Sequence, residues 1–472
     1  MEGIISYGAH IPIYRLGSEV IGNMWGRKER KGEKAVANYD EDSLTMGVAA
    51  GRACLEGIEK SSIDALYFAS TTPPFKEKQS ASIIAAALDL REDIVTIDIA
   101  NSMRSGTIAL RLALDIVKAQ PGRKVLVVIS DCRIPPPNSA FETVFGDGAA
   151  AFLIGEGVAV EPIGSYCVTS EFIDIWRLEC DKFVRTWEDR FIREEGYIPY
   201  LQRAITGLMK SCDLSFGDLS KLAFYAPNEG LHRAMIKILG IDGKVQVQDP
   251  LFSKVGNTGA AFAPMLLIGA LEEAKVGDKI LLANYGDGAD AYLFHVTQKI
   301  DKLRDRRGIK KNLESKLAID NYGRYVKFRD LMELEQTPEY RQRTSLPEIW
   351  RDRRWVYRLH GHRCKKCGKV QFPMQKFCMY CQAKEEFLEE IPLSDRKGTL
   401  FTFSLDERSP VIDPPNVLAA VNLEGGGRFF SQMTDRDPEK LKVGIPMELS
   451  FRKIHDALGV HNYFWKCLPA RG

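Results

Sequence analysis

The sequence lacks an excess of charge of either sign, because 65 Lys and Arg residues face 63 Asp and Glu residues in 472. Proteins that bind nucleic acid or anionic membranes through their overall field carry a large positive surplus, so the net charge excludes that class. The chain also lacks a long apolar run. Its most membrane-like stretch, residues 255–271, is interrupted by Gly, Asn and Pro and is shorter than the roughly 20 residues that span a bilayer.

The first residues, MEGIISYGAHIPIYR, contain an early acid and no long apolar segment, so we expect no signal peptide. Six of the ten cysteines are scattered, as free thiols of a reducing compartment usually are. The composition also excludes collagen-like and disordered classes. We therefore expect a cytoplasmic globular protein, and its length predicts two or more domains.

The first 297 residues contain one pattern twice. Residues 124–131 (KVLVVISD) and 279–286 (KILLANYG) are Val/Ile/Leu runs, typical of strands buried on both faces. Each follows a helical pattern rich in small residues, and each leads to a Gly-Asp-Gly turn and a further apolar strand. The repetition predicts an α/β fold with two related halves, about 1–160 and 161–297, packed on buried central helices. Coincidence between two common α/β patterns is the alternative.

The character of the sequence changes after residue 297. Residues 298–356 are highly charged with isolated aromatics and leucines, which predicts a helical connector between domains. A solvated connector is one interpretation. The alternative is that some of its cations face an anionic ligand such as a nucleotide phosphate. Residues 391–472 consist of short strand-like runs separated by Gly, Pro and Asp, which predicts an all-β barrel or sandwich.

Cys364, Cys367, Cys378 and Cys381 form the pattern C-x2-C-x10-C-x2-C within residues 357–390. Each pair can turn two thiolates onto one metal, and two pairs complete a tetrahedral sulfur site for zinc. Because four protein ligands leave no open position, we expect the zinc to be structural. The alternatives are reduced free cysteines and a redox-active pair, and the redox interpretation leaves the second pair unexplained.

Three segments, residues 98–114, 224–235 and 255–294, resemble 3-hydroxy-3-methylglutaryl-CoA synthase and its relatives in the thiolase superfamily. The likeness covers roughly residues 1–330. YRLHGHRCKKCGKVQFP, KFCMYC and GTLFTFS resemble the zinc-ribbon and OB-fold domain that accompanies thiolases and synthases acting on acyl-CoA. The resemblance implies a duplicated thiolase-like (αβαβα) fold over 1–297, a zinc ribbon over 357–390 and an OB-fold barrel over 391–472.

The resemblance also implies a nucleophilic Cys at a strand-to-helix elbow, where the helix N-terminus lowers the thiol pKa. Aligned through Gly106-Thr107, that position is Met103, whose thioether cannot form an acyl-thioester. The family's His corresponds to Tyr225 and its acid/base Glu to Thr71. The Asn of its Gly-Asn motif is retained as Asn257. Most of the family's catalytic chemistry is therefore absent.

Other residues near the inherited site are candidate replacements for the missing chemistry. Tyr225 is a candidate acid towards an enolate. Cys132, at the end of a predicted strand, is a candidate cleft residue or a small buried thiol. His232 is a candidate site residue or a capping or packing residue. The aromatic residues of segment 175–201 are candidates for a lid or tunnel wall, or for one face of buried helices.

Three functional hypotheses follow. The first is an acyl-CoA-handling subunit for Claisen or retro-Claisen chemistry, a homodimer within a hetero-oligomer, which depends on a thiolase-like partner that holds the acylated Cys. The second is an autonomous synthase-like acyltransferase, or a lyase or aldolase, that uses an oxyanion hole and an acid such as Tyr225. The third is a nucleic-acid-binding module. Residues 391–472 lack the basic stripe that nucleic acid requires, so we expect neither nucleic acid nor membrane as a partner.

Overall fold

The computed structural model describes residues 1–28, 31–244, 246–333 and 343–471, which form two compact units. The first unit comprises Met1–Ala37, Asp42–Ser82 and Asp93–Tyr325, and the second comprises Asn38–Glu41, Ile83–Glu92 and Val326–Gly472. Two short segments of the N-terminal part of the chain therefore belong to the second unit. Within the described ranges, every helix is too short or too polar to cross a bilayer.

A nine-stranded sheet with the order β11-β12-β13-β8-β1-β7-β6-β4-β5 forms the centre of the first unit. Its strands are β1 (Glu2–His10), β4 (Ala65–Ala69), β5 (Val95–Ile99), β6 (Val125–Asp131), β7 (Gly148–Glu156), β8 (Val160–Thr169), β11 (Lys221–Phe224), β12 (Lys279–Tyr285) and β13 (Gly288–Val296). One pairing, Ile4 with Val160, joins β1 to β8 and so connects the two halves. The two Val/Ile/Leu runs predicted as buried strands are β6 and β12, and both are buried along almost their whole length.

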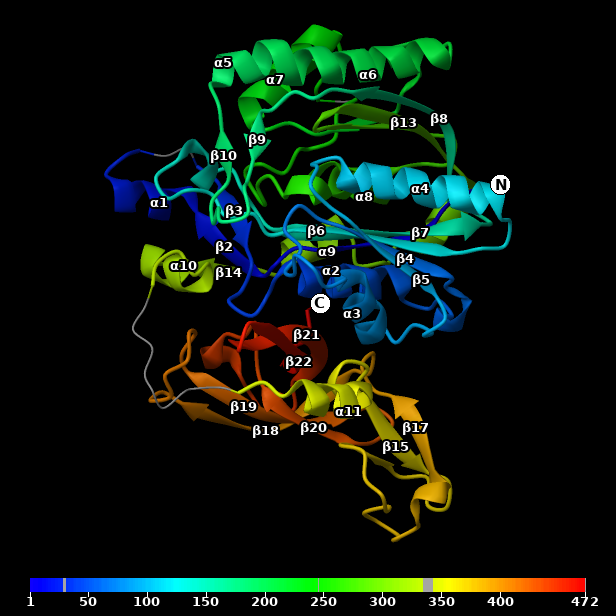
Figure 1. Ribbon diagram of the computed structural model, residues 1–472, viewed down its shortest axis with the longest axis vertical. Helices are drawn as coiled ribbons and strands as arrows, with labels where there is room; N and C mark the ends of the chain where they lie inside the picture. The colour runs from blue at the N-terminus through cyan, green and yellow to red at the C-terminus, as the bar shows by residue number, and fades with distance from the viewer. Residues whose placement is uncertain (29–30, 245, 334–342, 472) are drawn as a thin grey trace. The chain divides into compact units, whose positions relative to one another are not determined.

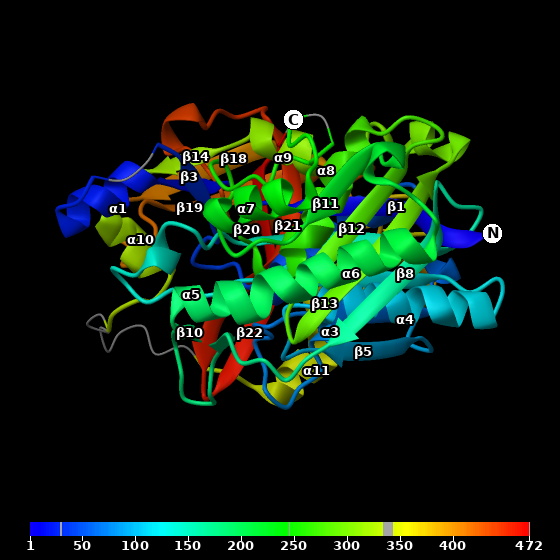
Figure 2. The same cartoon turned by 90° about the horizontal axis from the view of Figure 1, so that it is seen from above.

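Helices cover the sheet in layers, as Figure 1 shows. The main helices are α2 (Ser43–Leu55), α4 (Ser105–Ala119), α6 (Ile198–Ser211), α7 (Glu229–Leu239), α8 (Phe262–Glu273) and α9 (Ile309–Glu314). Helices α4 and α8 lie between β8 and β13 on one side and β6 and β7 on the other (Figure 1). Seen from above, α6 crosses β8 and β13, which it packs against (Figure 2). The predicted duplicated α/β fold with buried central helices is confirmed.

The sequences of the helices match the layers in which they lie. Residues 262–271 of α8 are all buried, which explains why this helix is apolar on every side. In contrast, α6 buries one face, through Leu201, Ala204, Ile205 and Leu208, and exposes the other. The apolar stretch at residues 255–271 is therefore a buried segment between layers of a globular unit.

Smaller elements complete the first unit. They are α1 (Ser18–Trp25), β2 (Tyr14–Gly17), β3 (Glu33–Val36), β9 (Ile175–Trp176), β10 (Arg185–Thr186), α5 (Asp189–Phe191) and β14 (Leu317–Ile319). Strand β14 pairs in parallel with β2, and residues 298–325 of the expected connector belong to this unit. Helices α3 (Ser80–Ala87) and α10 (Tyr322–Phe328) lie at the unit boundaries, and residues 334–342 of the expected connector lie outside the described residues.

Two sheets form most of the second unit. The three-stranded sheet contains β15 (His360–Cys364), β16 (Val370–Gln371) and β17 (Leu388–Pro392), and it follows α11 (Leu346–Val356). The five-stranded sheet contains β18 (Gly398–Asp406), β19 (Asn416–Leu423), β20 (Arg428–Gln432), β21 (Pro446–Ala457) and β22 (Val460–Pro469). A bridge from Met433 to Cys467 connects the end of β20 to β22 and closes the barrel around Phe429, Phe451 and Trp465. The predicted all-β C-terminal region is confirmed.

A buried ionic cluster lies inside the second unit. Arg452, only 1% exposed on β21, contacts Asp40 at 3.2 Å and Glu41 at 2.9 Å, and it also pairs with Asp435. Lys466 on β22 lies 2.9 Å from the carboxylate of Asp40. Because buried charges need partners, this cluster holds the segment 38–41 against the barrel strands.

Candidate functional site

Met103 lies between β5 and the first turn of α4, at the elbow that the sequence analysis identified, and is 6% exposed. Its backbone carbonyl accepts a hydrogen bond of 3.0 Å from Asn284 Nδ2. Gly286 passes so close that a Cβ atom there would lie 2.7 Å from the Cβ of Met103, and its φ is +153°. The second Gly-Asp-Gly turn therefore needs glycine at its first position in order to pack against the elbow.

A buried ion pair fixes the same elbow to the other half of the fold. Arg104, the residue after Met103, lies 2.8 Å from the carboxylate of Asp290 on β13. Its second terminal nitrogen donates to the backbone oxygen of Asp287 at 2.8 Å. The elbow thus has a defined position relative to the second turn.

Asn257 is fully buried and connects the two central positions of the site, Met103 and Tyr225. Its Nδ2 donates to Tyr225 Oη at 3.3 Å and to the backbone oxygen of Ala226 at 3.1 Å. Its Oδ1 accepts from Arg133 Nη2 at 2.9 Å, and Arg133 Nη1 lies 3.5 Å from the sulfur of Met103. Met103, Tyr225 and Asn257 therefore belong to one hydrogen-bonded network.

Thr71 belongs to the same region through Asp131, the last residue of β6. The Thr71 amide and hydroxyl donate to the Asp131 carboxylate at 2.6 and 2.8 Å. The backbone amide of Ala260 donates to that carboxylate at 2.7 Å, three residues after Asn257. The structure thus brings all four sequence-predicted positions, Thr71, Met103, Tyr225 and Asn257, into one region.

Tyr225 is almost completely buried, and its ring lies edge-on to Phe262 at a centroid distance of 5.7 Å. Burial raises the pKa of Tyr225, so its phenol is protonated at neutral pH. A protonated phenol can donate a hydrogen bond, and it is a weak base.

The two weaker candidates, Cys132 and His232, lie at different elements of the first unit. Cys132 is half-buried directly after β6, and its amide donates to Thr72 Oγ1 at 2.9 Å. His232 lies on α7 and stacks on Phe224 at 4.4 Å. Burial lowers the pKa of His232 to about 4, so the ring is neutral. The stacking favours the packing interpretation for His232.

Sequence reasoning missed Asp131, Arg133 and Arg177. Arg177, just after β9, donates to the backbone oxygen of Thr71 at 2.6 Å. Segment 175–201 therefore reaches the site through a cation and also through an aromatic residue, Tyr197, whose hydroxyl donates to the backbone oxygen of Tyr225 at 2.9 Å. Asp131 and Arg133 flank Cys132 at the C-terminal end of a buried strand. Side chains at that edge of an α/β sheet often contact ligands, and this was the available signal.

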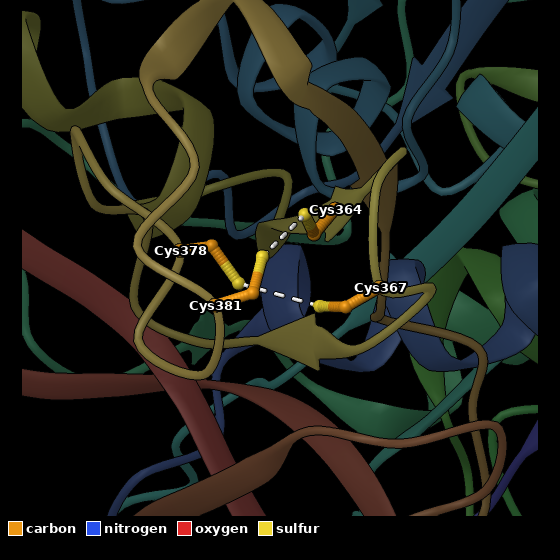
Figure 3. Close-up of side chains that lie close together, drawn as sticks. All are labelled: Cys364, Cys367, Cys378 and Cys381. Carbon is orange, nitrogen blue, oxygen red and sulfur yellow. Dashed lines mark hydrogen bonds between the residues drawn. The ribbon is translucent and has the colours of Figure 1, made fainter.

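The four cysteines of the zinc motif converge in the second unit, and their side chains point toward one another (Figure 3). The four Sγ atoms lie within 4.8 Å of one another, with 3.6 Å between Cys364 and Cys381 and 3.5 Å between Cys367 and Cys378. A tetrahedral zinc with Zn–S bonds of about 2.3 Å needs sulfurs about 3.8 Å apart. The four thiols therefore fit a zinc ion, and all four coordination positions are protein ligands.

Three family models match parts of the chain. They are 3-oxoacyl-[acyl-carrier-protein (ACP)] synthase III over residues 97–171, the ChsH2 rubredoxin-like zinc ribbon domain over residues 355–386, and the ChsH2 C-terminal OB-fold domain over residues 390–452. The last two confirm the predicted zinc ribbon and OB fold.

Whole proteins resemble about two thirds of the chain. The hydroxymethylglutaryl-CoA synthase of Methanopyrus kandleri is 31% identical over 340 residues, which cover 69% of this chain and 97% of that protein. The synthase of the same name from Methanocaldococcus jannaschii is 32% identical over 342 residues, with coverage of 70% and 99%.

Solved structures share the fold. A crystal structure of HMG-CoA synthase complexed with CoA has a TM-score of 0.62 at 19% identity, over 73% of this chain and 94% of that one. The 3-oxoacyl-[acyl-carrier-protein] synthase III from Aquifex aeolicus has a TM-score of 0.56 at 20% identity, over 62% and 100%.

Proposed function

Because the chain belongs to the hydroxymethylglutaryl-CoA synthase family, we propose that it binds acyl-CoA thioesters and takes part in forming or cleaving carbon–carbon bonds by Claisen-type chemistry. A relative of the same fold has been crystallised with CoA, which supports a CoA thioester as the ligand. The whole synthases match 69–70% of the chain, and the zinc ribbon and the OB-fold barrel match family models of their own.

The proposal depends most on Met103. At the elbow where the family places a nucleophilic thiol, this chain has a thioether beside Arg133. A thioether has no proton to lose and cannot form an acyl-thioester. We therefore propose that the chain is a supporting subunit, a homodimer within a cytoplasmic hetero-oligomer, and that a thiolase-like partner supplies the acylated cysteine.

The remaining residues have positioning roles in this proposal. Asn257 holds Tyr225 and Arg133 through its two ends, and Asp131 holds Thr71. Cys364, Cys367, Cys378 and Cys381 hold the zinc, which supplies folding energy to the ribbon and takes no part in the reaction.

A second function is favoured by the polar groups that surround Met103. The protonated phenol of Tyr225 contacts Nδ2 of Asn257, and the guanidinium of Arg133 contacts Oδ1 of the same side chain. A lyase, an aldolase or an acyltransferase that uses no acyl-cysteine needs such donors to stabilise an enolate. Under this alternative the chain is catalytic alone.

Purification of the tagged full-length chain from its native host distinguishes the two functions. The first function predicts that a thiolase-like chain with an intact cysteine co-purifies, and that this complex turns over acyl-CoA whereas the separated chain does not. A Met103→Ala variant is expected to leave the turnover of the complex within a few-fold of the unaltered complex. Turnover by the isolated chain at the rate of the complex would favour the second function.

A further inference from the structure

In the second unit, a loop of three glycines connects β19 to β20 and binds an arginine from the turn before β18. The φ values of Gly425, Gly426 and Gly427, the glycine loop, are +75°, +98° and +92°, a region that favours glycine. Arg396 Nη1 donates to the backbone oxygens of Glu424 and Gly426 at 3.1 and 3.3 Å. Both acceptors are uncharged, so they hold the guanidinium without neutralising its charge.

A second guanidinium, that of Arg363 on β15, lies beside the same loop. Arg363 pairs with Val370 on β16, and a Cβ atom at Gly427 would lie 3.3 Å from Val370 Cγ1. Because side chains alternate along a strand, Arg363 shares a face of β15 with Gly361. A Cβ atom at Gly361 would lie 2.7 Å from Leu393, which begins the turn that carries the first guanidinium. The exposed Arg363 is therefore directed toward that turn.

The charges of the two guanidinium groups act on each other. Partial burial lowers the pKa of Arg396, and the charge of Arg363 lowers it further. Glu389 is the neighbour of Arg363 on β17. Among the residues that the structure describes, however, neither guanidinium forms an ion pair with a carboxylate. Two cations held near each other in this way favour an anion that contacts both.

Further hydrogen-bond donors lie at the glycine loop itself. Within the described part of the chain, the backbone amides of Gly425 and Gly427 have no hydrogen-bond partner. Arg428 follows the loop directly, and its Nε donates to Asn422 Oδ1 at 2.9 Å. Its guanidinium lies 3.7 Å above the centroid of the Phe401 ring, and that side chain is 45% exposed. Guanidinium groups and loop amides together form the donor set that phosphate oxygens accept from.

We propose that Arg363, Arg396 and the glycine loop bind a phosphate group in the second unit. A planar guanidinium suits phosphate because it offers two parallel N–H donors. The phosphate group has two sources, free inorganic phosphate or the phosphate of a nucleotide, and the exposed ring of Phe401 suits the base of a nucleotide. The inference is independent of the proposed function, because it uses residues of the second unit alone.

Calorimetric titration of the zinc-loaded full-length chain tests the inference with inorganic phosphate, ADP and adenosine. Adenosine has the base and sugar of ADP and no phosphate, so it is the matched control ligand. We expect phosphate or ADP to bind, and adenosine to bind about 10-fold or more weakly than ADP wherever ADP binds. Equal affinity for phosphate and ADP identifies the phosphate group alone as the ligand, whereas tighter binding of ADP identifies a nucleotide.

Variants connect the binding to the two arginines. Arg363→Gln and Arg396→Gln are each expected to weaken binding about 10-fold or more, and Arg396→Lys to weaken it less, because the charge remains. Arg351→Gln, which alters an exposed arginine of α11 that pairs with Asp352, is the control and should bind as the unaltered chain does. Because Arg363 is exposed, its variant keeps the test valid if Arg396→Gln fails to fold.

Two results overturn the inference. One is that neither phosphate nor ADP binds to the unaltered chain. The other is binding that Arg363→Gln leaves unchanged, which would place the phosphate elsewhere in the protein. No CoA thioester is among the probes, so either result leaves the proposed function as it stands.

Discussion

The side-chain amide of Asn257 donates to the phenol oxygen of Tyr225 at 3.3 Å, so two of the expected site residues are in direct contact. The same Asn257 amide group also contacts the backbone oxygens of Ala226 and Pro227. Asn257 therefore keeps partners when the phenol oxygen is removed. We therefore expect Tyr225→Phe to leave the position of Asn257 unchanged, so that a change in rate reports on the phenol itself.

For Tyr225→Phe we expect a loss of stability of about 1–3 kcal/mol, because the phenol oxygen loses its hydrogen bonds with Asn257 and Arg133. In the supporting-subunit account, turnover of the purified complex changes less than about threefold. If Tyr225 is the acid, the rate falls by roughly 10²–10⁴-fold. Steady-state kinetics of the complex with each variant separates the two accounts.

Zinc content is expected to depend on the ribbon cysteines alone. Metal analysis of the full chain should find one zinc per chain, and Cys378→Ser should lose most of it, because three thiolates hold zinc more weakly than four. Cys180→Ser, which alters an exposed cysteine outside the motif, is the matched control and should keep the zinc. A metal-free chain with an unchanged Tm would show that the four thiols have no structural metal.

Arg452→Met should strongly destabilise the second unit. It leaves the buried carboxylates of Asp40, Glu41 and Asp435 without their shared cation, a change that typically costs about 3–5 kcal/mol. We expect the Tm of the thermal transition in which the barrel unfolds to fall by roughly 6 °C or more. Arg428→Met, which removes an exposed arginine from β20, is the control and should shift it by less than about 2 °C. Similar shifts in both variants would contradict a structural role for the cluster.

His360 gives the second unit a pH-dependent contribution to stability. Its Nε2 lies 2.8 Å from Asp89 and its Nδ1 contacts Glu390, while Arg358 also contacts Asp89 and Arg354 contacts Glu390. Burial alone would lower the pKa of His360, but the two carboxylates outweigh burial and raise it. The pKa of Asp89 and that of Glu390 are both lowered: burial would raise each, but the hydrogen bonds from His360 and the neighbouring arginines outweigh it.

The sign of the pH effect follows from these directions. The contribution of a group with a raised pKa is fully present below its unfolded value, about 6.5 for His, and is lost as the pH rises through the folded value. The contributions of the carboxylates are lost in acid. We expect His360→Gln to lower Tm most between about pH 5 and 6.5 and least in alkaline buffer. His295→Gln in the first unit controls for loss of an imidazole, and a Tm difference for His360→Gln that grows with pH would contradict the assignment.

Local patterns in the sequence were sufficient to predict the layers of the fold and the cluster of four zinc-ligating cysteines. The apolar runs of β6 and β12, the all-round apolarity of α8 and the spacing of the four cysteines are properties of short segments, and each reflects its surroundings directly. The expected position of Met103, between a strand and a helix, agrees with its place between β5 and α4.

Long-range pairing could not be predicted in this way. Nothing near residues 38–41 indicates that their carboxylates meet Arg452 and Lys466, which lie more than 400 residues later. Arg133 and Arg177 likewise resemble ordinary surface cations in the sequence, because the groups that hold them, Asn257 and Thr71, come from other parts of the chain. Charged residues of this kind acquire their role only through the fold.

The central claim is that Met103 prevents this chain from carrying an acyl group, and intact-mass spectrometry of the purified polypeptide with acyl-CoA tests it most directly. We predict an unchanged mass for the unaltered chain, and a Met103→Cys variant, with a thiol before the first turn of α4, is expected to gain one acyl group. An acyl adduct on any side chain of the unaltered protein during turnover would contradict the account.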